Sequence, residues 1–116
     1  MLIVEDDSDI TEMLGLLLPS EGFEVVRAEH GAEALQYLRS GGTLPDLILL
    51  DLMMPVMSGW EFRDRQLTDP ELAKIPVIVM TGVGDWDQVL TARADAYMTK
   101  PVDFGELLAT VARVVG

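Results

Sequence analysis

The chain has 116 residues, of which 49% are hydrophobic, a size and composition that suit one folded domain with a single core. Its net charge of −12 and eight scattered basic residues argue against direct binding to nucleic acid, because phosphate backbones are held by clustered Lys and Arg. The absence of cysteine excludes disulfides and thiol catalysis, and no signal-peptide pattern or apolar run of the ~18 residues that span a bilayer is present, so we expect a cytoplasmic protein without membrane insertion.

Short apolar runs alternate with helical patterns five times along the chain, which is typical of a parallel α/β sheet. A strand at residues 2–5 precedes a helix that begins at its N-cap, Ser8, and ends before Pro19. A second strand at 23–27 and a helix at 31–39 follow, and then come the most apolar strand, 47–51, and a helix at 58–67. A strand at 76–81, a short helix at 85–93, a strand at 96–99 and a helix at 103–114 complete the order. Right-handed crossovers then predict a five-stranded doubly wound sheet.

Four of the predicted strands run directly into residues with reactive side chains. The first leads into Glu5 and Asp6, the third ends at Asp51, the fourth ends at Thr81 and the fifth leads into Lys100. In an open parallel sheet, ligands lie just beyond the carboxyl ends of the strands, so these side chains should share one edge. Carboxylates placed together repel one another unless a cation lies among them. The sequence therefore predicts a site for a hard metal ion and a phosphoryl group.

Asp51 is the candidate nucleophile, because a carboxylate at the end of a central strand can attack phosphorus and form an aspartyl-phosphate. Lys100 would pair with one phosphoryl oxygen, and Thr81 would donate a hydrogen bond to another. Such transfer needs alignment and charge neutralisation more than covalent machinery. We expect these three residues to perform the chemistry.

The expected metal ligands are the oxygens of Glu5, Asp6 and Asp51, with the backbone carbonyl of Met53 as a further ligand. Mg²⁺ keeps several of its waters and takes few protein ligands, so a partial set of carboxylates suffices. The expected cofactor is Mg²⁺ or Mn²⁺.

Four stretches carry a family resemblance: residues 2–7, 46–59, 76–81 and 94–101. Together they resemble the receiver domain of two-component response regulators, in order and at near-family spacing over essentially the whole chain. The resemblance implies a flavodoxin-like fold with strand order 2-1-3-4-5 flanked by five helices. It also implies a single receiver domain over residues 1–116, with no output domain in this sequence.

The resemblance further implies a signalling module, not a dedicated enzyme. It would accept phosphate onto Asp51 from a sensor histidine kinase or a phosphotransfer protein. Thr81 matches the family's switch hydroxyl, Tyr97 its aromatic switch residue and Lys100 its invariant lysine, and the Lys100-Pro101 bond is often cis in such domains. Phosphorylation would draw Thr81 and then Tyr97 inward and reshape the surface of the fourth helix, fifth strand and fifth helix. That surface would act on a downstream effector protein or domain, or form a phosphorylation-dependent dimer.

Two positions and two departures from the family bear on how the module works. Met53 and Val83 lie where related domains tune hydrolysis, and because apolar side chains orient water poorly, we expect a long-lived phosphoryl group. The chain has about three residues fewer than the family between Thr81 and Lys100, and it lacks the usual glycine before the fifth strand, in the region of Arg93. We expect a shortened fourth helix and an altered partner surface, with the chemistry retained.

Other readings weigh less or stay open. A phosphatase with an aspartyl nucleophile would need a second acid two residues after Asp51, where Met53 stands. A receiver-like scaffold or dimerisation module that never takes phosphate is the other alternative, against which the complete set of site residues counts. His30, the sole histidine, is expected to be a surface residue. Trp86 is open between a partner contact and ordinary partial burial.

Overall fold

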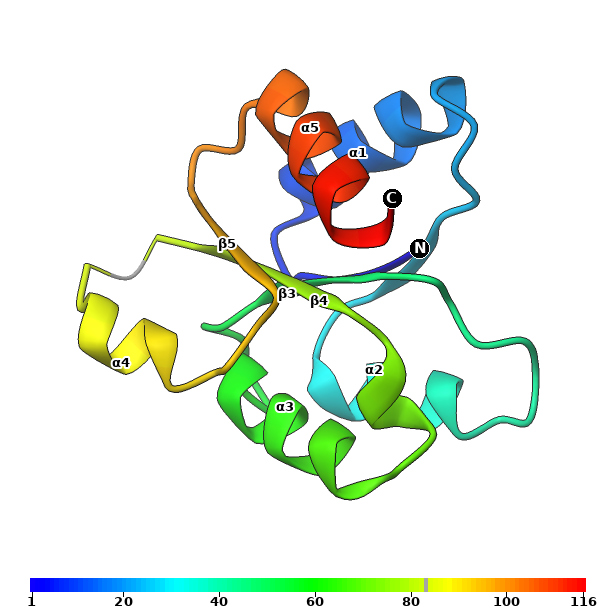
Figure 1. The fold of residues 1–116 in the computed structure, drawn as a ribbon, viewed down its shortest axis with the longest axis vertical. Coiled ribbons are helices and arrows are strands. Elements are labelled where there is room, and N and C mark those ends of the chain that lie inside the picture. The colour runs from blue at the N-terminus through cyan, green and yellow to red at the C-terminus, as the bar shows by residue number, and fades with distance from the viewer. Residues whose placement is uncertain (83) are drawn as a thin grey trace.

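The computed structural model describes residues 1–82 and 84–116, so Val83, a predicted hydrolysis-tuning residue, lies outside the described part of the chain. Its parallel sheet has the order β2-β1-β3-β4-β5, with helices on both faces (Figure 1). The strands are β1 (Leu2–Val4), β2 (Val26–Ala28), β3 (Ile48–Asp51), β4 (Val77–Thr81) and β5 (Ala96–Thr99). The helices are α1 (Ser8–Ser20), α2 (Gly31–Leu38), α3 (Gly59–Thr68), the 3₁₀ turn η1 (Leu72–Lys74), α4 (Trp86–Leu90) and α5 (Phe104–Val115).

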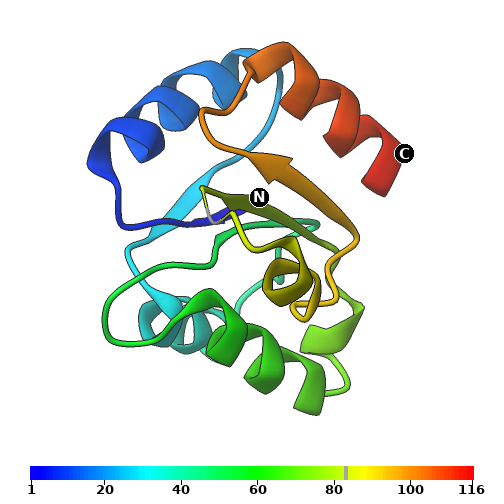
Figure 2. The same ribbon diagram turned by 90° about the vertical axis from the view of Figure 1, so that its left-hand side faces the viewer.

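The two faces of the sheet are covered by different helices. Helices α1 and α5 lie on one face, and α2, α3 and α4 lie on the other, as both views show (Figures 1 and 2). The predicted doubly wound fold and its strand order are therefore confirmed. Within the described residues no helix has the length and apolar character needed to cross a membrane.

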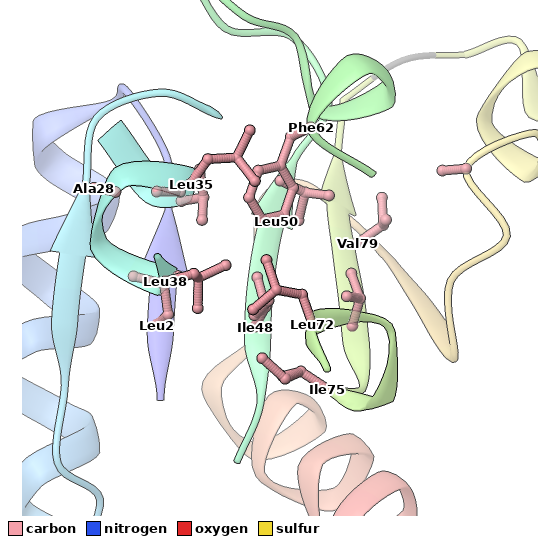
Figure 3. Close-up of a cluster of buried hydrophobic side chains, with 14 of the residues drawn as sticks. Leu2, Ala28, Leu35, Leu38, Ile48, Leu50, Phe62, Leu72, Ile75 and Val79 are labelled. Carbon is pink, nitrogen blue, oxygen red and sulfur yellow. The ribbon is translucent and has the colours of Figure 1, made fainter. Parts of the chain in front are cut away.

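The sheet is buried on both faces, which is why its central strands are apolar throughout. Successive side chains of a strand point to opposite faces, so Leu2 and Val4 enter one core and Ile3 the other. Phe62 of α3 is fully buried in the core under α2 and α3 (Figure 3), and burying such a side chain stabilises the fold by about 1.5–3 kcal/mol. Both cores hold the sheet rigid beneath the edge where the strands end.

Three predicted boundaries were wrong, each for a local reason. Asp7, not Ser8, is the N-cap of α1, since its Oδ1 accepts from the amide of Asp9 at 2.9 Å. The helix continues through Pro19, because the proline carbonyl still accepts from the amide of Gly22 at 3.0 Å. The second strand begins at Val26 because its pairing partner β1 is only three residues long.

The fourth helix is shorter than predicted, and an extra turn was missed. The helix α4 ends at Leu90 instead of residue 93, with Asp85 as its N-cap. Arg93, which replaces the expected glycine, has φ = 52°, in the left-handed region that glycine favours. The 3₁₀ turn η1 was not predicted. The Lys100-Pro101 peptide bond, whose isomer the sequence left open, is cis.

Candidate functional site

The acidic residues predicted to meet at the carboxyl edge of the sheet do meet there. Strands β1 and β3 are paired in parallel with Val4 opposite Leu50, so Glu5 and Asp51 end neighbouring strands. One carboxylate oxygen from each of Glu5, Asp6 and Asp51 lies within 4.8 Å of the other two. Glu5 is 1% exposed and Asp51 3% exposed, whereas Asp6 faces solvent. The sheet thus concentrates three negative groups at one point.

Lys100 supplies the positive charge in this cluster. Its Nζ lies 2.5 Å from Glu5 Oε1 and 3.4 Å from Asp51 Oδ1. Burial lowers the pKa of Lys100, but its close contact with the Glu5 carboxylate and the Asp51 charge together outweigh burial, so its pKa ends above the ordinary value. The charged ammonium is therefore favoured beside the Asp51 carboxylate.

Glu5 is the strained member of the cluster. Burial raises its pKa above the ordinary value, and the neighbouring Asp51 raises it further, while Lys100 acts in the opposite direction. Glu5 Oε1 is buried and makes no well-angled hydrogen bond among the described residues, although the Lys100 ammonium is close. Its other oxygen accepts weakly from the amide of Asp7 at 3.3 Å. A cation between these carboxylates would relieve their repulsion.

An open hollow of ≈ 510 Å³ lies over the cluster. Met53 is exposed on its wall, and the Met53 amide donates to Asp51 Oδ1 at 3.4 Å. The hollow gives an incoming anion a route to the Asp51 carboxylate, which forms part of its lining. Its residues are Glu5, Asp6, Asp7, Asp51, Met53, Gly82 and Lys100.

Thr81 occupies the end of β4 and is fully buried. Its carbonyl accepts from the amide of Lys100 at 2.9 Å, and it lies opposite Thr99 in the parallel register of β4 and β5. Asp51 of β3 pairs with Met80 of β4, so Thr81 lies one residue beyond the pairing partner of Asp51. The fold therefore sets Thr81 at the same edge as Asp51 and Lys100.

Tyr97 does not line the hollow and instead contacts the end of α4. Its hydroxyl accepts from the amide of Ala94 at 2.8 Å and donates to the carbonyl of Leu90 at 3.4 Å. Its ring meets Trp86 edge-on, with centroids 6.3 Å apart and an interplanar angle of 76°. The predicted aromatic switch residue is thus attached to the α4 surface, away from the acidic cluster. Trp86 itself is exposed.

Sequence reasoning missed several residues that hold the fold around the site. His30 is more than a surface residue, because its Nδ1 caps α2 by accepting from the amide of Glu33 at 3.2 Å. Arg63 and Gln66 are buried on α3 and make side-chain hydrogen bonds to distant carbonyls. A histidine before a helical pattern could have suggested the cap, whereas charged side chains are by default placed on the surface.

The donor set fits a hard divalent cation. All three clustered ligands are carboxylates, and oxygen donors of this kind suit Mg²⁺ and Mn²⁺ over softer metals. Burial, with the neighbouring Asp51 carboxylate as a second cause, raises the pKa of Glu5, and Lys100 is the cation that the described residues bring to it. The solvent-facing Asp6 leaves room for the waters that Mg²⁺ retains.

The structure is a doubly wound α/β domain with an acid cluster and a lysine at the carboxyl edge of its sheet. The chain belongs to the response regulator receiver domain family, whose family model matches residues 1–112. The resemblance found in the sequence is thereby confirmed.

Two curated relatives and one solved structure are similar to the chain. It is 38% identical to the phosphate regulon transcriptional regulatory protein PhoB of Pseudomonas aeruginosa, a match that covers 99% of this chain but 51% of PhoB. It is 33% identical to the polar-differentiation response regulator DivK of Brucella anthropi, covering 100% of this chain and 95% of DivK. The response regulator TrrA of Thermotoga maritima, solved in complex with Mg²⁺–BeF, has a TM-score of 0.82 and 34% identity, covering 97% and 95% of the two chains. The chain therefore spans about half of one relative and nearly all of another.

Proposed function

We propose that the chain takes a phosphoryl group onto Asp51 from a histidine kinase or a phosphotransfer protein. The observation that carries this proposal is the convergence of Glu5, Asp6 and Asp51 within 4.8 Å, with the Lys100 ammonium 3.4 Å from Asp51 Oδ1, under an open hollow. An acceptor carboxylate needs that combination of access, nearby positive charge and metal-binding oxygens.

The transfer exchanges one bond to phosphorus for another. An Asp51 carboxylate oxygen attacks phosphorus, and the bond from phosphorus to the donor's imidazole nitrogen breaks, so that the electron pair leaves with the imidazole. A bound Mg²⁺ or Mn²⁺, held by Glu5, Asp6, Asp51 and the Met53 carbonyl, would neutralise charge on the phosphoryl oxygens. The TrrA structure in complex with Mg²⁺–BeF supports this reading by analogy.

Lys100 and Thr81 would receive the transferred group. The Lys100 ammonium already sits between Glu5 and Asp51 and would turn toward a phosphoryl oxygen as a charge-assisted partner. The Thr81 hydroxyl, at the end of the next strand, would donate to another oxygen. Movement of Thr81 toward Asp51 would vacate space beside β5.

Tyr97 would respond to the movement of Thr81 by turning its ring inward. Its hydroxyl now bridges the amide of Ala94 and the carbonyl of Leu90, so an inward turn of its ring would break both bonds and alter the end of α4. The surface of α4, β5 and α5 would thus differ between the two states and control a downstream effector or a dimer. We place this activity in the cytoplasm, where kinases of this class present their phosphohistidine.

The lifetime of the phosphoryl group would depend on the residues around the hollow. Met53 lines it with an apolar side chain that cannot orient an attacking water. Slow hydrolysis is the expected consequence. A purified phosphorylated sample that loses its phosphate within seconds would refute this part of the proposal.

The test is incubation with a small acyl phosphate and Mg²⁺, followed by intact mass. We expect one phosphoryl adduct in the wild type and in Asp46→Asn, a control at the opposite edge of the sheet, and none in Asp51→Asn. No adduct in the wild type would favour a phosphate-independent scaffold. Continued turnover of phosphoesters would favour the phosphatase.

A further inference from the structure

Arg63 is a buried cation held by hydrogen bonds, and Asp95 is the nearby acidic group whose charge raises its pKa against the effect of burial. It is 6% exposed, and no ion pair among the described residues includes it. Burial lowers the pKa of Arg63, as expected for a charge withdrawn from water. A buried charge outside an ion pair is costly unless hydrogen bonds satisfy its donors, so the hydrogen-bond partners of Arg63 show what this side chain holds in place.

The guanidinium binds the segment that joins α4 to β5. Its Nε donates to the carbonyl of Ala92 at 3.1 Å, and its Nη2 donates to the carbonyl of Arg93 at 2.7 Å. A forked donor of this shape holds two adjacent carbonyls at once, which a lysine cannot do. Arg63 therefore closes the end of the shortened fourth helix from the buried side.

The segment from α4 to β5 needs such support because its local structure is unstable on its own. A helix of five residues is far below the ~12–15 residues at which isolated helices become stable. Arg93 has left-handed backbone geometry, which is unfavourable for an L-residue with a side chain. The two carbonyls that Arg63 binds lie immediately before and within this strained residue. Strain of this kind persists only where the surroundings over-determine the backbone.

Arg63 is itself fixed by neighbours one turn away on α3. Gln66 is 0% exposed, and its Oε1 accepts from Arg63 Nη1 at 2.8 Å, while its Nε2 donates to the carbonyls of Leu72 and Ile75. Trp60, one turn earlier, donates its indole N–H to the carbonyl of Gln88 at 3.1 Å. Trp60, Arg63 and Gln66 form the α3 polar row, which anchors α4, the 91–95 connection and η1 to one helix.

The α3 polar row is tied to the strand of the acceptor aspartate. The amide of Gly59, the first residue of α3, donates to the carbonyl of Leu52 at 2.9 Å. A Cβ at Gly59 would clash with the Asp51 carbonyl oxygen, so the helix approaches this backbone more closely than a residue with a side chain would allow. The start of α3 is therefore fixed against β3.

We propose that Arg63 is the positioning residue for the α4–β5 connection, holding it to α3 through the Ala92 and Arg93 carbonyls and so setting the surface that partners meet. Tyr97 binds the same segment from the β5 side through other groups, the amide of Ala94 and the carbonyl of Leu90. The use of this surface by partners rests on the proposed function. The hydrogen-bonded hold does not.

Hydrogen–deuterium exchange of the unphosphorylated protein tests the proposal. Arg63→Met keeps the apolar stem but has no donor, and Arg65→Met, two residues along the same helix and exposed, is the matched control. We expect amides of residues 91–95 to exchange about tenfold faster or more in Arg63→Met, because the segment loses the two charge-assisted hydrogen bonds to the Ala92 and Arg93 carbonyls and opens more readily. Amides of β1 and α5, and all amides of Arg65→Met, should keep wild-type rates.

Two further variants separate positioning from general stability. Arg63→Lys keeps the charge but can reach one carbonyl at a time, so it should restore only part of the protection. Gln66→Met removes the group that orients Arg63 and should accelerate exchange in the same segment by a smaller factor. If Arg63→Met does not fold, the exchange rates of Gln66→Met test the proposal in its place. Wild-type rates in residues 91–95 of these variants, or equal losses in every element, would overturn the proposal.

The exchange measurement stands apart from the phosphorylation chemistry. Failure of Asp51 to take phosphate would count against the proposed function and would leave the exchange result intact. Unchanged exchange of residues 91–95 in Arg63→Met, together with normal phosphorylation of Asp51, would refute only the proposed role of Arg63.

Discussion

The carboxyl edge of the sheet and the α4–β5 connection lie at opposite ends of β5, and different kinds of contact build them. At the carboxyl edge, the candidate side chains lie at the ends of their strands or directly after them: Asp51 ends β3, Glu5 follows β1 and Lys100 follows β5. The α4–β5 connection is held by side chains from elsewhere, including Arg63 of α3 and Tyr97 of β5. The proposed chemistry thus depends on residues at the strand ends, whereas the proposed partner surface depends on long-range hydrogen bonds.

Removing the Lys100 charge should damage the first region most. Lys100→Met is expected to slow phosphorylation of Asp51 by about 100-fold, because one preorganised charge on the phosphoryl oxygens is lost. The initial rate with a small acyl phosphate measures this, and Lys74→Met, an exposed lysine in a weak ion pair, is the control. Exchange in residues 91–95 should stay unchanged, and a parallel change there would contradict the separation of the two regions.

Metal binding at the site should weaken as pH falls. The folded-state pKa of Glu5 is raised above 4.5, so a proton competes with the cation at pH values where a free carboxyl would be ionised. For the metal-free protein, the contribution of Glu5 to the free energy of unfolding falls as pH rises from 4.5 through the raised pKa, since the folded state retains a proton that the unfolded state has released.

Thermal unfolding with and without Mg²⁺ at two pH values measures this linkage. We expect Mg²⁺ to raise the Tm more near neutral pH than near pH 5. Glu5→Gln, which cannot ionise, should show a small Mg²⁺ effect at both. An equal Mg²⁺ effect at both pH values in the wild type would exclude Glu5 as the competing group.

Loss of the Tyr97 hydroxyl should affect the second region by a smaller amount. Tyr97→Phe leaves the amide of Ala94 without its partner and should lower the free energy of unfolding by about 1–2 kcal/mol. Denaturant unfolding measures the change, and Tyr37→Phe, on the partly buried flank of α2, provides a comparison. Uptake of phosphate on Asp51 should be unaffected, and a slowed uptake would show that the two regions are coupled before phosphorylation.

The smallest expected effect is a gain at Arg93. Arg93→Gly places a residue without a Cβ at φ = 52° and should raise the free energy of unfolding by about 1 kcal/mol. The exposed ion pair between Arg93 and Asp64 contributes little against this. Arg113→Gly, in the last turn of α5, should instead destabilise. A loss of stability in Arg93→Gly would mean that the arginine side chain has a further role.

The contrast also explains which features the sequence could predict. Glu5, Asp51 and Thr81 were found because strand periodicity is local and parallel strands bring their carboxyl ends together. The strand order followed from the family resemblance. The start of β2 could not be predicted from the sequence, because it depends on the length of β1, its pairing partner. Pro19 was read as a stop, although its carbonyl still serves the last turn of α1.

Arg63 and Gln66 were missed for a different reason. A charged or polar side chain is predicted to be buried only when its buried partners are known. The carbonyls that Arg63 binds, those of Ala92 and Arg93, lie about thirty residues away along the chain. The shortened fourth helix was predicted from residue counts, but the contacts that replace its missing turn could not be. Long-range partners of this kind require the three-dimensional arrangement.

The central claim is that Asp51 carries the phosphoryl group. Borohydride reduction converts an aspartyl-phosphate to homoserine, so treatment of the acyl-phosphate-incubated protein followed by peptide mapping locates the acceptor directly. The account predicts homoserine at position 51 and at no other aspartate, and only when Mg²⁺ or Mn²⁺ is present. Homoserine at another position, or an unmodified position 51 in protein that has gained a phosphoryl group, would contradict it.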